Sequence, residues 1–335
     1  MTVTEIQPAL PWIHTPLLES KALSEVAGCR VFMKMDMFQP SGSFKSRGVG
    51  NEILKFILSR PSDSPATHVY CSSGGNAGLA AVFASKALGA LCTVVVPSST
   101  TAFMKSKLLA AGATEVITHG ASFVDADMHT RTLVASDVNG FYCAPFDHED
   151  VWDANSTLID EILEDIPGGE APEAIVASVG GGGLFIGIQL GLERHGLEKK
   201  VKVVAVETEG AESLNAALRA RELVTLPAIT SIATSLGART VAKKAFEVGQ
   251  YPNVISKVVS DGMAARSCIK MAEDERVLVE AACGASLAAV YEVGLKKTIP
   301  ELTSNSKVVV IVCGGSNINL DMLAHYKQEY GIQQK

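Results

Sequence analysis

The residues of this chain that could do chemistry gather first around Lys45, in the run SGSFKSRG at residues 41–48. The lysine follows a strand-like segment, Val31 to Phe38, and a turn of small residues, at the expected start of a helix. Lost solvation and the helix N-terminal dipole both disfavour an ammonium ion there, so we expect a lowered pKa for Lys45. Such an amine can form a Schiff base with an aldehyde. On this octet alone, an ordinary surface lysine in a loop fits equally well.

Four consecutive glycines form a second candidate element, in the run SVGGGGLF at residues 178–185. They follow the apolar run AIVAS and precede a helical stretch from Leu184 to Leu192. Glycine permits positive φ and close approach of the backbone, and backbone N–H groups at a helix N-terminus bind phosphate. The run matches neither the GxGxxG dinucleotide pattern nor the GK[ST] of a P-loop. Because a tight turn rarely needs four glycines, the pattern favours a phosphate cradle.

Two further small-residue turns, CSSGGNAG at 71–78 and VIVCGGSN at 310–317, also follow expected strands. In the first, Ser72, Ser73 and the N–H groups after them could receive a carboxylate, and Asn76 could hydrogen-bond a ring hydroxyl. Helix capping alone would also favour Ser and Asn there. In the second, Cys313 ends an apolar strand, where ligands of open α/β sheets collect. An inert core position is the usual alternative for an isolated cysteine.

The elements that must position these residues alternate along the chain. Helices are expected over 76–88 and 102–111, the second stopped by Gly112, with others after each later strand. Continuous apolar strands that alternate with helices indicate a parallel sheet covered on both faces. At 335 residues, the chain is long enough for two such domains. Strands are expected over 68–72, 92–97, 115–119, 174–179, 203–207 and 308–313.

Composition narrows the class of protein. Hydrophobic residues make up 47% and charged residues 19%, which is ordinary for a globular enzyme, and a net charge of −7 disfavours nucleic acid as a partner. No apolar run approaches membrane-spanning length, and residues 1–20 lack the pattern of a secretory signal. The seven cysteines form no CxxC pair, which favours reduced thiols in the cytoplasm. His148 lies in an acidic loop, where we expect solvation rather than metal binding.

Taken together, the motifs resemble the fold-type II pyridoxal phosphate enzymes, the tryptophan synthase β family, and within it the liver-type serine dehydratase branch. The resemblance implies an α/β fold of two domains, each a mostly parallel sheet flanked by helices, with residues 1–37 plus 145–335 forming the large cofactor-binding domain and 38–144 the small one. We expect no regulatory module after residue 330. The matching segments are HTPLLES (14–20), SGSFKSRG, CSSGGNAG, SVGGGGL, VETEGAESL (206–214), ITSIATSLGA (229–238), ACGASLAAVY (282–291) and VCGGSNI (312–318).

The resemblance also implies a role for each matching residue. Lys45 would bind pyridoxal phosphate covalently and then act as acid and base at the substrate Cα, with Phe44 packed on the pyridine ring. Asn76 would bond the ring oxygen, and Cys313 would face the pyridine nitrogen. The phosphate would lie on Gly180, Gly181, Gly182, Gly183 and Leu184, and the substrate carboxylate on Ser73, Gly74, Gly75 and Ala77. A cation would be held by Gly180, Glu207, Ala211, Ser213, Leu236 and Ala238.

Three departures from the family pattern narrow the choice of expected reaction and bound cation. Ala77 stands where racemases and biosynthetic threonine dehydratases have His. Gly74 stands where racemases have Ser and other liver-type dehydratases have Ala, so racemisation is disfavoured and a methyl contact with substrate or cofactor is absent. Ser213 stands where relatives with a divalent cation have Asp, which favours potassium.

The resemblance therefore implies dehydration of L-serine to pyruvate and ammonia, with L-threonine giving 2-oxobutanoate more slowly. A homodimer is expected, with a small amino acid as substrate. β-Elimination or β-replacement on hydroxyaspartate, cysteine or a pathway-specific amino acid is an alternative. A weakly active protein that binds the cofactor in a regulatory role is another, against which intact Lys45 and the intact glycine run argue.

Overall fold

The computed structural model describes residues 9–331. Contacts divide them into two compact units, a smaller one of residues 9–13, 39–41 and 45–151 and a larger one of residues 14–38, 42–44 and 152–331. Residues 9–13 and 145–151 thus belong to the smaller unit, outside the limits of 38–144 expected for the small domain. Residues 1–8, part of the segment expected to lack a secretory signal, lie outside the described residues.

The larger unit is built on a six-stranded sheet in the order β1-β2-β10-β7-β8-β9. β1 is antiparallel to β2, and all other neighbours are parallel. All five residues of β7 are buried, as expected of a strand covered on both faces. The strands are β1 (Leu17–Ser20), β2 (Arg30–Lys34), β7 (Ala174–Ser178), β8 (Lys202–Thr208), β9 (Val254–Val259) and β10 (Lys307–Ile311).

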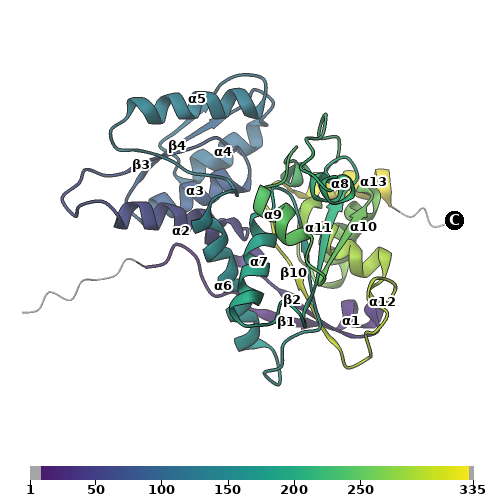
Figure 1. Cartoon of the computed structure of the whole chain (residues 1–335). Helices are drawn as coiled ribbons and strands as arrows, with labels where there is room; N and C mark the ends of the chain where they lie inside the picture. The colour runs from purple at the N-terminus through teal and green to yellow at the C-terminus, as the bar shows by residue number, and fades with distance from the viewer. Residues whose placement is uncertain (1–8, 332–335) are drawn as a thin grey trace, which may run out of the picture. The chain divides into compact units, whose positions relative to one another are not determined.

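Helices cover both faces of this sheet. α11 packs against β7, β8 and β10, with α10 packed on α11, while α7 contacts β7. Figure 1 shows α10 and α11 on one side of these strands and α6 and α7 on the other. The helices are α1 (Lys21–Ala27), α6 (Glu149–Asp165), α7 (Gly183–Arg194), α8 (Ser213–Ala220), α9 (Lys243–Gly249), α10 (Asp261–Asp274), α11 (Ala281–Ala288), α12 (Leu295–Thr298) and α13 (Leu320–Tyr330), with short turns at Asp36–Phe38, Thr234–Leu236 and Ala289–Val293.

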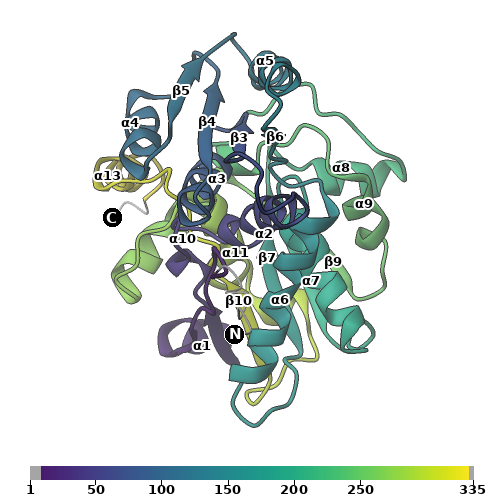
Figure 2. The ribbon, with the colours of Figure 1, turned by 90° about the vertical axis from the view of Figure 1, so that its left-hand side faces the viewer.

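The smaller unit has a parallel four-stranded sheet in the order β5-β4-β3-β6, whose strands lie side by side in Figure 2. α3 packs on β3 and β4 with α2 and α4 beside it, and α5 covers the other face (Figure 1). Apolar residues of β3, β4, α2 and α3 form its core. The elements are α2 (Lys45–Leu58), β3 (His68–Cys71), α3 (Asn76–Ala87), β4 (Leu91–Val96), α4 (Ala102–Ala111), β5 (Glu115–Thr118), α5 (Phe123–Ser136) and β6 (Gly140–Tyr142).

One expected strand is shorter than predicted. Residues 31–38 read as one strand, but β2 ends at Lys34 and the chain turns at Asp36–Phe38. Asp36 is fully buried, and its Oδ1 accepts a hydrogen bond of 2.6 Å from Thr15 Oγ1. A buried carboxylate needs such partners, and the turn lets Asp36 reach Thr15.

No helix within residues 9–331 has the length and apolar character that a membrane crossing requires.

Candidate active site

Lys45 is the first residue of α2, so the predicted helix start is confirmed. Its Nζ donates a hydrogen bond of 2.5 Å to the Pro145 carbonyl and lies 5.9 Å from the centre of the Phe146 ring. Both partners belong to the segment that follows β6 in the smaller unit. The amine therefore contacts the Pro145–Phe146 segment.

The residues just before Lys45 pair with the turn after β10 in the larger unit. Phe44 N donates to Cys313 O at 3.1 Å, Gly315 N donates to Gly42 O at 2.9 Å, and Ser43 and Gly314 form an isolated antiparallel bridge. Gly314 has φ +82°, and a Cβ there would lie 2.4 Å from Gly42 O. Only glycine permits both the conformation and the approach. Phe44 and Cys313 are thus neighbours, as the predicted ring contacts require.

The Cys313 thiol is buried at the end of β10, 3.6 Å from the hydroxyl of Ser178. A hydrogen bond with Cys283 and burial raise the pKa of the thiol well above its usual range. The thiol therefore stays protonated near neutral pH. A ring nitrogen placed against it would meet an uncharged group and not a carboxylate.

The glycine run lies between β7 and α7, as predicted. Gly182 is the N-cap of α7 with φ +99°, and no side chain caps the first turn of this helix. A Cβ on Gly182 would lie 2.4 Å from Ala245 Cβ, and one on Gly180 would lie 2.9 Å from Leu236 Cα. The backbone at Gly180 and Gly182 therefore approaches its neighbours as only glycine allows, beside a helix N-terminus that suits an anion.

In the turn CSSGGNAG, some residues are available to a ligand and others are buried in the smaller unit. Gly75 is the N-cap of α3 without a side-chain cap, and Asn76 begins the helix, which leaves this N-terminus suited to a carboxylate. Ser73 Oγ accepts a bond of 3.3 Å from Gly75 N. Ser72 is different, because it is buried and its hydroxyl donates to Asp127 at 2.8 Å. Ala77 is also buried in the core, so only its backbone N–H could serve a substrate.

The sequence does not predict which side chains a Cβ added at Gly74 would meet. A Cβ on Gly74 would lie 2.9 Å from both Val96 Cγ1 and Thr100 Cγ2. These are short, branched side chains that rotate little, so any larger residue would have to displace the turn. Packing against Val96 and Thr100 thus favours glycine at position 74.

The predicted cation site has four residues near one another in the larger unit: Gly180, Glu207, Ser213 and Leu236. Val179 N donates to Val206 O, which places Gly180 and Glu207 at neighbouring strand ends, and Gly180 packs on Leu236. Glu207 is buried, and its oxygens each accept a bond of 2.8 Å from the N-terminal N–H groups of α8. Burial raises its pKa to about 8, against the lowering effect of those bonds.

A second observation at the same place concerns Ser213 and also indicates a cation site. Its hydroxyl is buried and has no hydrogen-bond partner among the described residues. A buried hydroxyl without a partner is unfavourable, and a cation beside it would remove the deficit. This observation fits the set of Gly180, Glu207, Ala211, Ser213, Leu236 and Ala238.

Comparison with known proteins decides the family. The family described as "Pyridoxal-phosphate dependent enzyme" (PALP) matches residues 9–314. The chain belongs to this family. The predicted membership in the fold-type II pyridoxal phosphate enzymes and the predicted fold class are therefore confirmed.

Relatives match nearly the whole chain. A bovine protein named L-serine dehydratase/L-threonine deaminase is 42% identical over 96% of this chain and 96% of its own length. A human protein named serine dehydratase-like is 44% identical over 95% of each chain. The crystal structure of a fungal L-serine ammonia-lyase from Rhizomucor miehei superposes with a TM-score of 0.87 at 36% identity, covering 95% of this chain and 99% of that one.

The residues present fit pyridoxal phosphate. The uncapped N-terminus of α7 suits its phosphate, and the buried Cys313 thiol beside Phe44 suits a pyridine ring. Lys45, the next residue after Phe44, supplies the amine that this cofactor needs for attachment.

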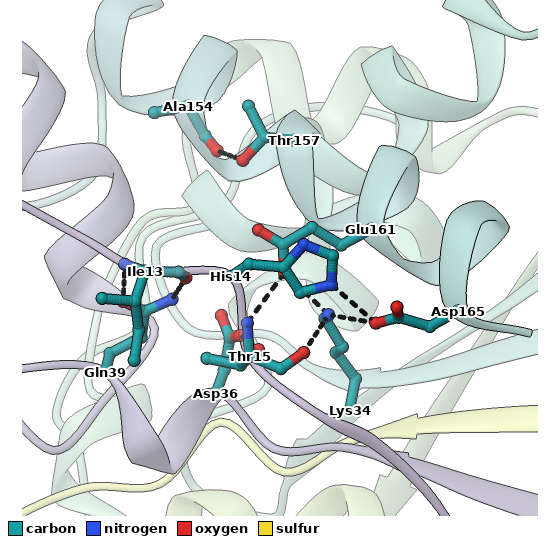
Figure 3. A network of polar contacts seen from close by, with 10 residues as sticks. All are labelled: Ile13, His14, Thr15, Lys34, Asp36, Gln39, Ala154, Thr157, Glu161 and Asp165. Atoms are coloured by element: carbon teal, nitrogen blue, oxygen red, sulfur yellow. Dashed lines mark hydrogen bonds and ion pairs between the residues drawn. The ribbon is translucent and has the colours of Figure 1, made fainter. Parts of the chain in front are cut away.

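The HTPLLES motif proves to have a structural role. Figure 3 shows the fully buried Lys34 of β2, whose Nζ lies 2.7 Å from Glu161 Oε2 and 3.6 Å from Asp165 and donates to Thr15 O at 2.5 Å. His14 Nε2 lies 2.7 Å from the same Asp165. A buried ammonium must be paired, so these contacts fix the start of the larger unit against β2 and α6.

Two residues near Lys45 were missed by the sequence analysis, Glu52 and Pro145. Pro145 accepts from Lys45 through its carbonyl, which no side-chain motif reveals. Glu52 lies seven positions after Lys45, on the same face of α2, and this spacing was the available signal.

Proposed function

We propose that this chain is an L-serine ammonia-lyase that converts L-serine to pyruvate and ammonia and acts more slowly on L-threonine. The observation that carries the proposal is the near-complete match to relatives named for this activity, at 42% identity to the bovine protein. The protonated Cys313 supports it. A neutral partner at the ring nitrogen makes a weaker electron sink than a carboxylate partner, which favours prompt loss of a β-substituent over transamination.

Each residue of the candidate site has a proposed role. When bound, pyridoxal phosphate supplies an aldehyde for the amino group and a ring that draws electrons from Cα. The α7 N-terminus, residues 180–184, holds the phosphate, Phe44 packs on the ring and Asn76 bonds the ring oxygen. Lys45, once free, removes the proton from Cα, and the turn of Ser73, Gly74, Gly75 and Ala77 holds the substrate carboxylate.

A substrate screen tests this proposal. Purified protein reconstituted with pyridoxal phosphate is given L-serine, L-threonine, hydroxyaspartate, cysteine and D-serine, and the 2-oxo acid and ammonia are measured. We expect L-serine to have the highest kcat/KM and L-threonine the next. A higher value for hydroxyaspartate or cysteine would replace the proposed substrate, and no turnover with any of them would favour a cofactor-binding protein without this activity.

Potassium is the cation that we propose for the set around Ser213. The carbonyl-rich ligands and a single carboxylate, Glu207, suit a large monovalent ion better than magnesium. Activity should therefore rise with potassium and be low in sodium or lithium alone. Initial rates with L-serine in chlorides of equal ionic strength measure this. Equal rates after potassium is exchanged for tetramethylammonium would contradict the proposal.

Racemisation should be absent in the wild type, because Gly74 carries no group that could protonate the face opposite Lys45. Gly74→Ser should produce some D-serine. Since its Cβ would lie 2.9 Å from Thr100 Cγ2, the change is made both alone and with Thr100→Ala, which provides space. Chiral chromatography of long incubations measures the product. D-serine from the wild type would mean that a second acid–base group has been missed.

Gly74→Ala in the same two backgrounds separates packing from chemistry. We expect the rate with L-serine to change by about two-hundredfold at most, since one methyl is worth about 1–3 kcal/mol at most. If packing against Val96 and Thr100 is the cause, Thr100→Ala should restore part of the rate. The same loss of rate with and without Thr100→Ala would mean that the added methyl acts on the bound substrate.

A cytoplasmic homodimer completes the proposal. All seven cysteines are buried free thiols, which suits a reducing compartment. Light scattering during gel filtration measures the assembly, and a monomer at working concentration would contradict the dimer.

A further inference from the structure

A buried carboxylate lies two helical turns along α2 from Lys45. Glu52 is 3% exposed, and both its oxygens accept from one backbone group, Ala144 N, at 3.1 and 3.0 Å. The Cys143 thiol lies 3.5 Å from Oε2 as a further donor. A buried carboxyl group requires hydrogen-bond donors, and these two contacts supply them.

The segment that Glu52 holds is the one that meets the Lys45 amine. Cys143 N extends the β6 ladder by donating to Tyr70 O at 2.9 Å, and Ala144 and Pro145 follow. The Pro145 carbonyl accepts from Lys45 Nζ at 2.5 Å. Proline locks φ near −65°, so the link from the Ala144 N–H to the Pro145 carbonyl is short and stiff. A shift of Ala144 would therefore move the acceptor of the amine.

We propose that Glu52 is a positioning residue for the Lys45 amine, which it orients by fixing the Ala144–Pro145 segment whose carbonyl accepts from Nζ. The meaning of this for catalysis rests on the proposed role of Lys45. A free amine held in one place by this carbonyl has a defined direction for proton transfer at Cα, and small misplacements of such groups reduce rates strongly.

Other side chains of α2 hold the far end of the same segment. Asn51 Nδ2 donates to Asp150 O at 2.8 Å, and Lys55 Nζ lies 2.8 Å from Asp150 Oδ1. These contacts are five residues beyond Pro145 and do not involve Ala144. Asn51 is therefore a matched control, because it bonds the same segment from the same helix without reaching the carbonyl that meets Lys45.

The charge of Glu52 changes with pH near neutrality. Burial raises its pKa to about 7, while the bonds from Ala144 and Cys143 lower it. The carboxylate therefore takes up a proton as pH falls through about 7 and becomes a poorer acceptor for Ala144 N. The titratable groups that face it are the thiols of Cys143 and Cys71, the imidazole of His148, 3.9 Å from Oε1, the carboxylate of Asp150 and the Lys45 amine near Cys71.

The test uses the pKa of the Lys45 amine in the protein without cofactor, measured by competitive acylation across pH and mass spectrometry of the Lys45 peptide. Glu52→Gln keeps an oxygen that can accept from Ala144 N but has no charge, and Glu52→Leu removes both. Loss of an acceptor for an ammonium group lowers its pKa. We expect a decrease of about one unit in Glu52→Leu and little change in Glu52→Gln or Asn51→Ala.

Equal decreases in Glu52→Gln and Glu52→Leu would overturn the proposal, because the charge alone would then act on the amine. If Glu52→Leu does not fold, Glu52→Ala takes its place, because it also removes both the acceptor and the charge. The Lys45 pKa should fall in that variant and stay near the wild-type value in Glu52→Gln, and an unchanged Lys45 pKa in Glu52→Ala would contradict a positioning role.

Catalysis supplies a second readout. In Glu52→Leu, kcat for L-serine should fall about tenfold or more, whereas kcat in Glu52→Gln should stay near the wild-type value. A wild type without lyase activity, but with the expected Lys45 titration, would reject the proposed function and leave this inference standing. An active wild type whose Lys45 titration is identical in all variants would support the proposed function and reject this inference.

Discussion

Replacement of Lys45 by alanine is expected to abolish turnover and leave the cofactor bound without a covalent bond. The amine is both the point of attachment and the proposed base at Cα, and loss of a general base alone costs about a hundredfold to ten-thousandfold. We therefore expect kcat with L-serine to fall by at least about that much in Lys45→Ala. The adduct is measured by borohydride reduction and peptide mass spectrometry, which should place it on Lys45 in the wild type.

The matched control is Lys55→Ala, which removes a lysine of the same helix that is half-exposed and paired with Asp150. It should keep activity and the reducible adduct. Retained turnover in Lys45→Ala together with an adduct on another lysine would reject the assignment. The absence of any adduct in an active wild type would reject the covalent role altogether.

Elements that are locally determined were predicted closely. The helix expected over 102–111 is α4, Ala102–Ala111, because Thr101 caps its start and Gly112, with φ +111°, ends it. The expected strands over 174–179 and 308–313 correspond to β7 and β10, whose continuous apolar runs are buried between helices. In both cases the signal lies within a few neighbouring residues.

Features that depend on distant partners were not predictable. Asp36 bends the chain because it is buried against Thr15, so the strand expected to reach Phe38 ends earlier. β1, Leu17–Ser20, was missed because a short edge strand shows little periodicity. A glutamate in a helix is usually solvated, so the spacing of Glu52 from Lys45 did not by itself predict its contact with Ala144.

The candidate site divides in the same way. The positions of Lys45 at a helix start and of the glycine run before α7 could be predicted, because each needs only a strand, a turn and a helix. The pairing of Phe44 with Cys313 and the packing of Gly74 on Val96 join residues far apart in sequence. The resemblance implied that Phe44 and Cys313 each contact the cofactor ring but not that they pair, and the Gly74 contact came only from the structure.

Replacement of Gly182 by leucine is expected to produce the second large effect, a loss of cofactor affinity. The position has φ +99°, and a Cβ would lie 2.4 Å from Ala245 Cβ, so the turn must move and the N–H groups of the α7 N-terminus with it. Hydrogen bonds to a charged group are worth about 1.5–3 kcal/mol each. Loss of one should raise the dissociation constant of pyridoxal phosphate about tenfold or more, measured by fluorescence titration.

Gly196→Leu provides the control, because Gly196 also has positive φ, +65°, follows the other end of α7 and has nothing within 4 Å of a Cβ. It carries similar backbone strain without touching the turn, so its cofactor affinity should equal that of the wild type. Circular dichroism confirms that both variants fold. An unchanged dissociation constant in folded Gly182→Leu would reject the phosphate cradle. An equal loss of cofactor affinity in Gly196→Leu would assign the effect to backbone strain in α7. The two substitutions have in common only their position at an end of this helix and a positive φ.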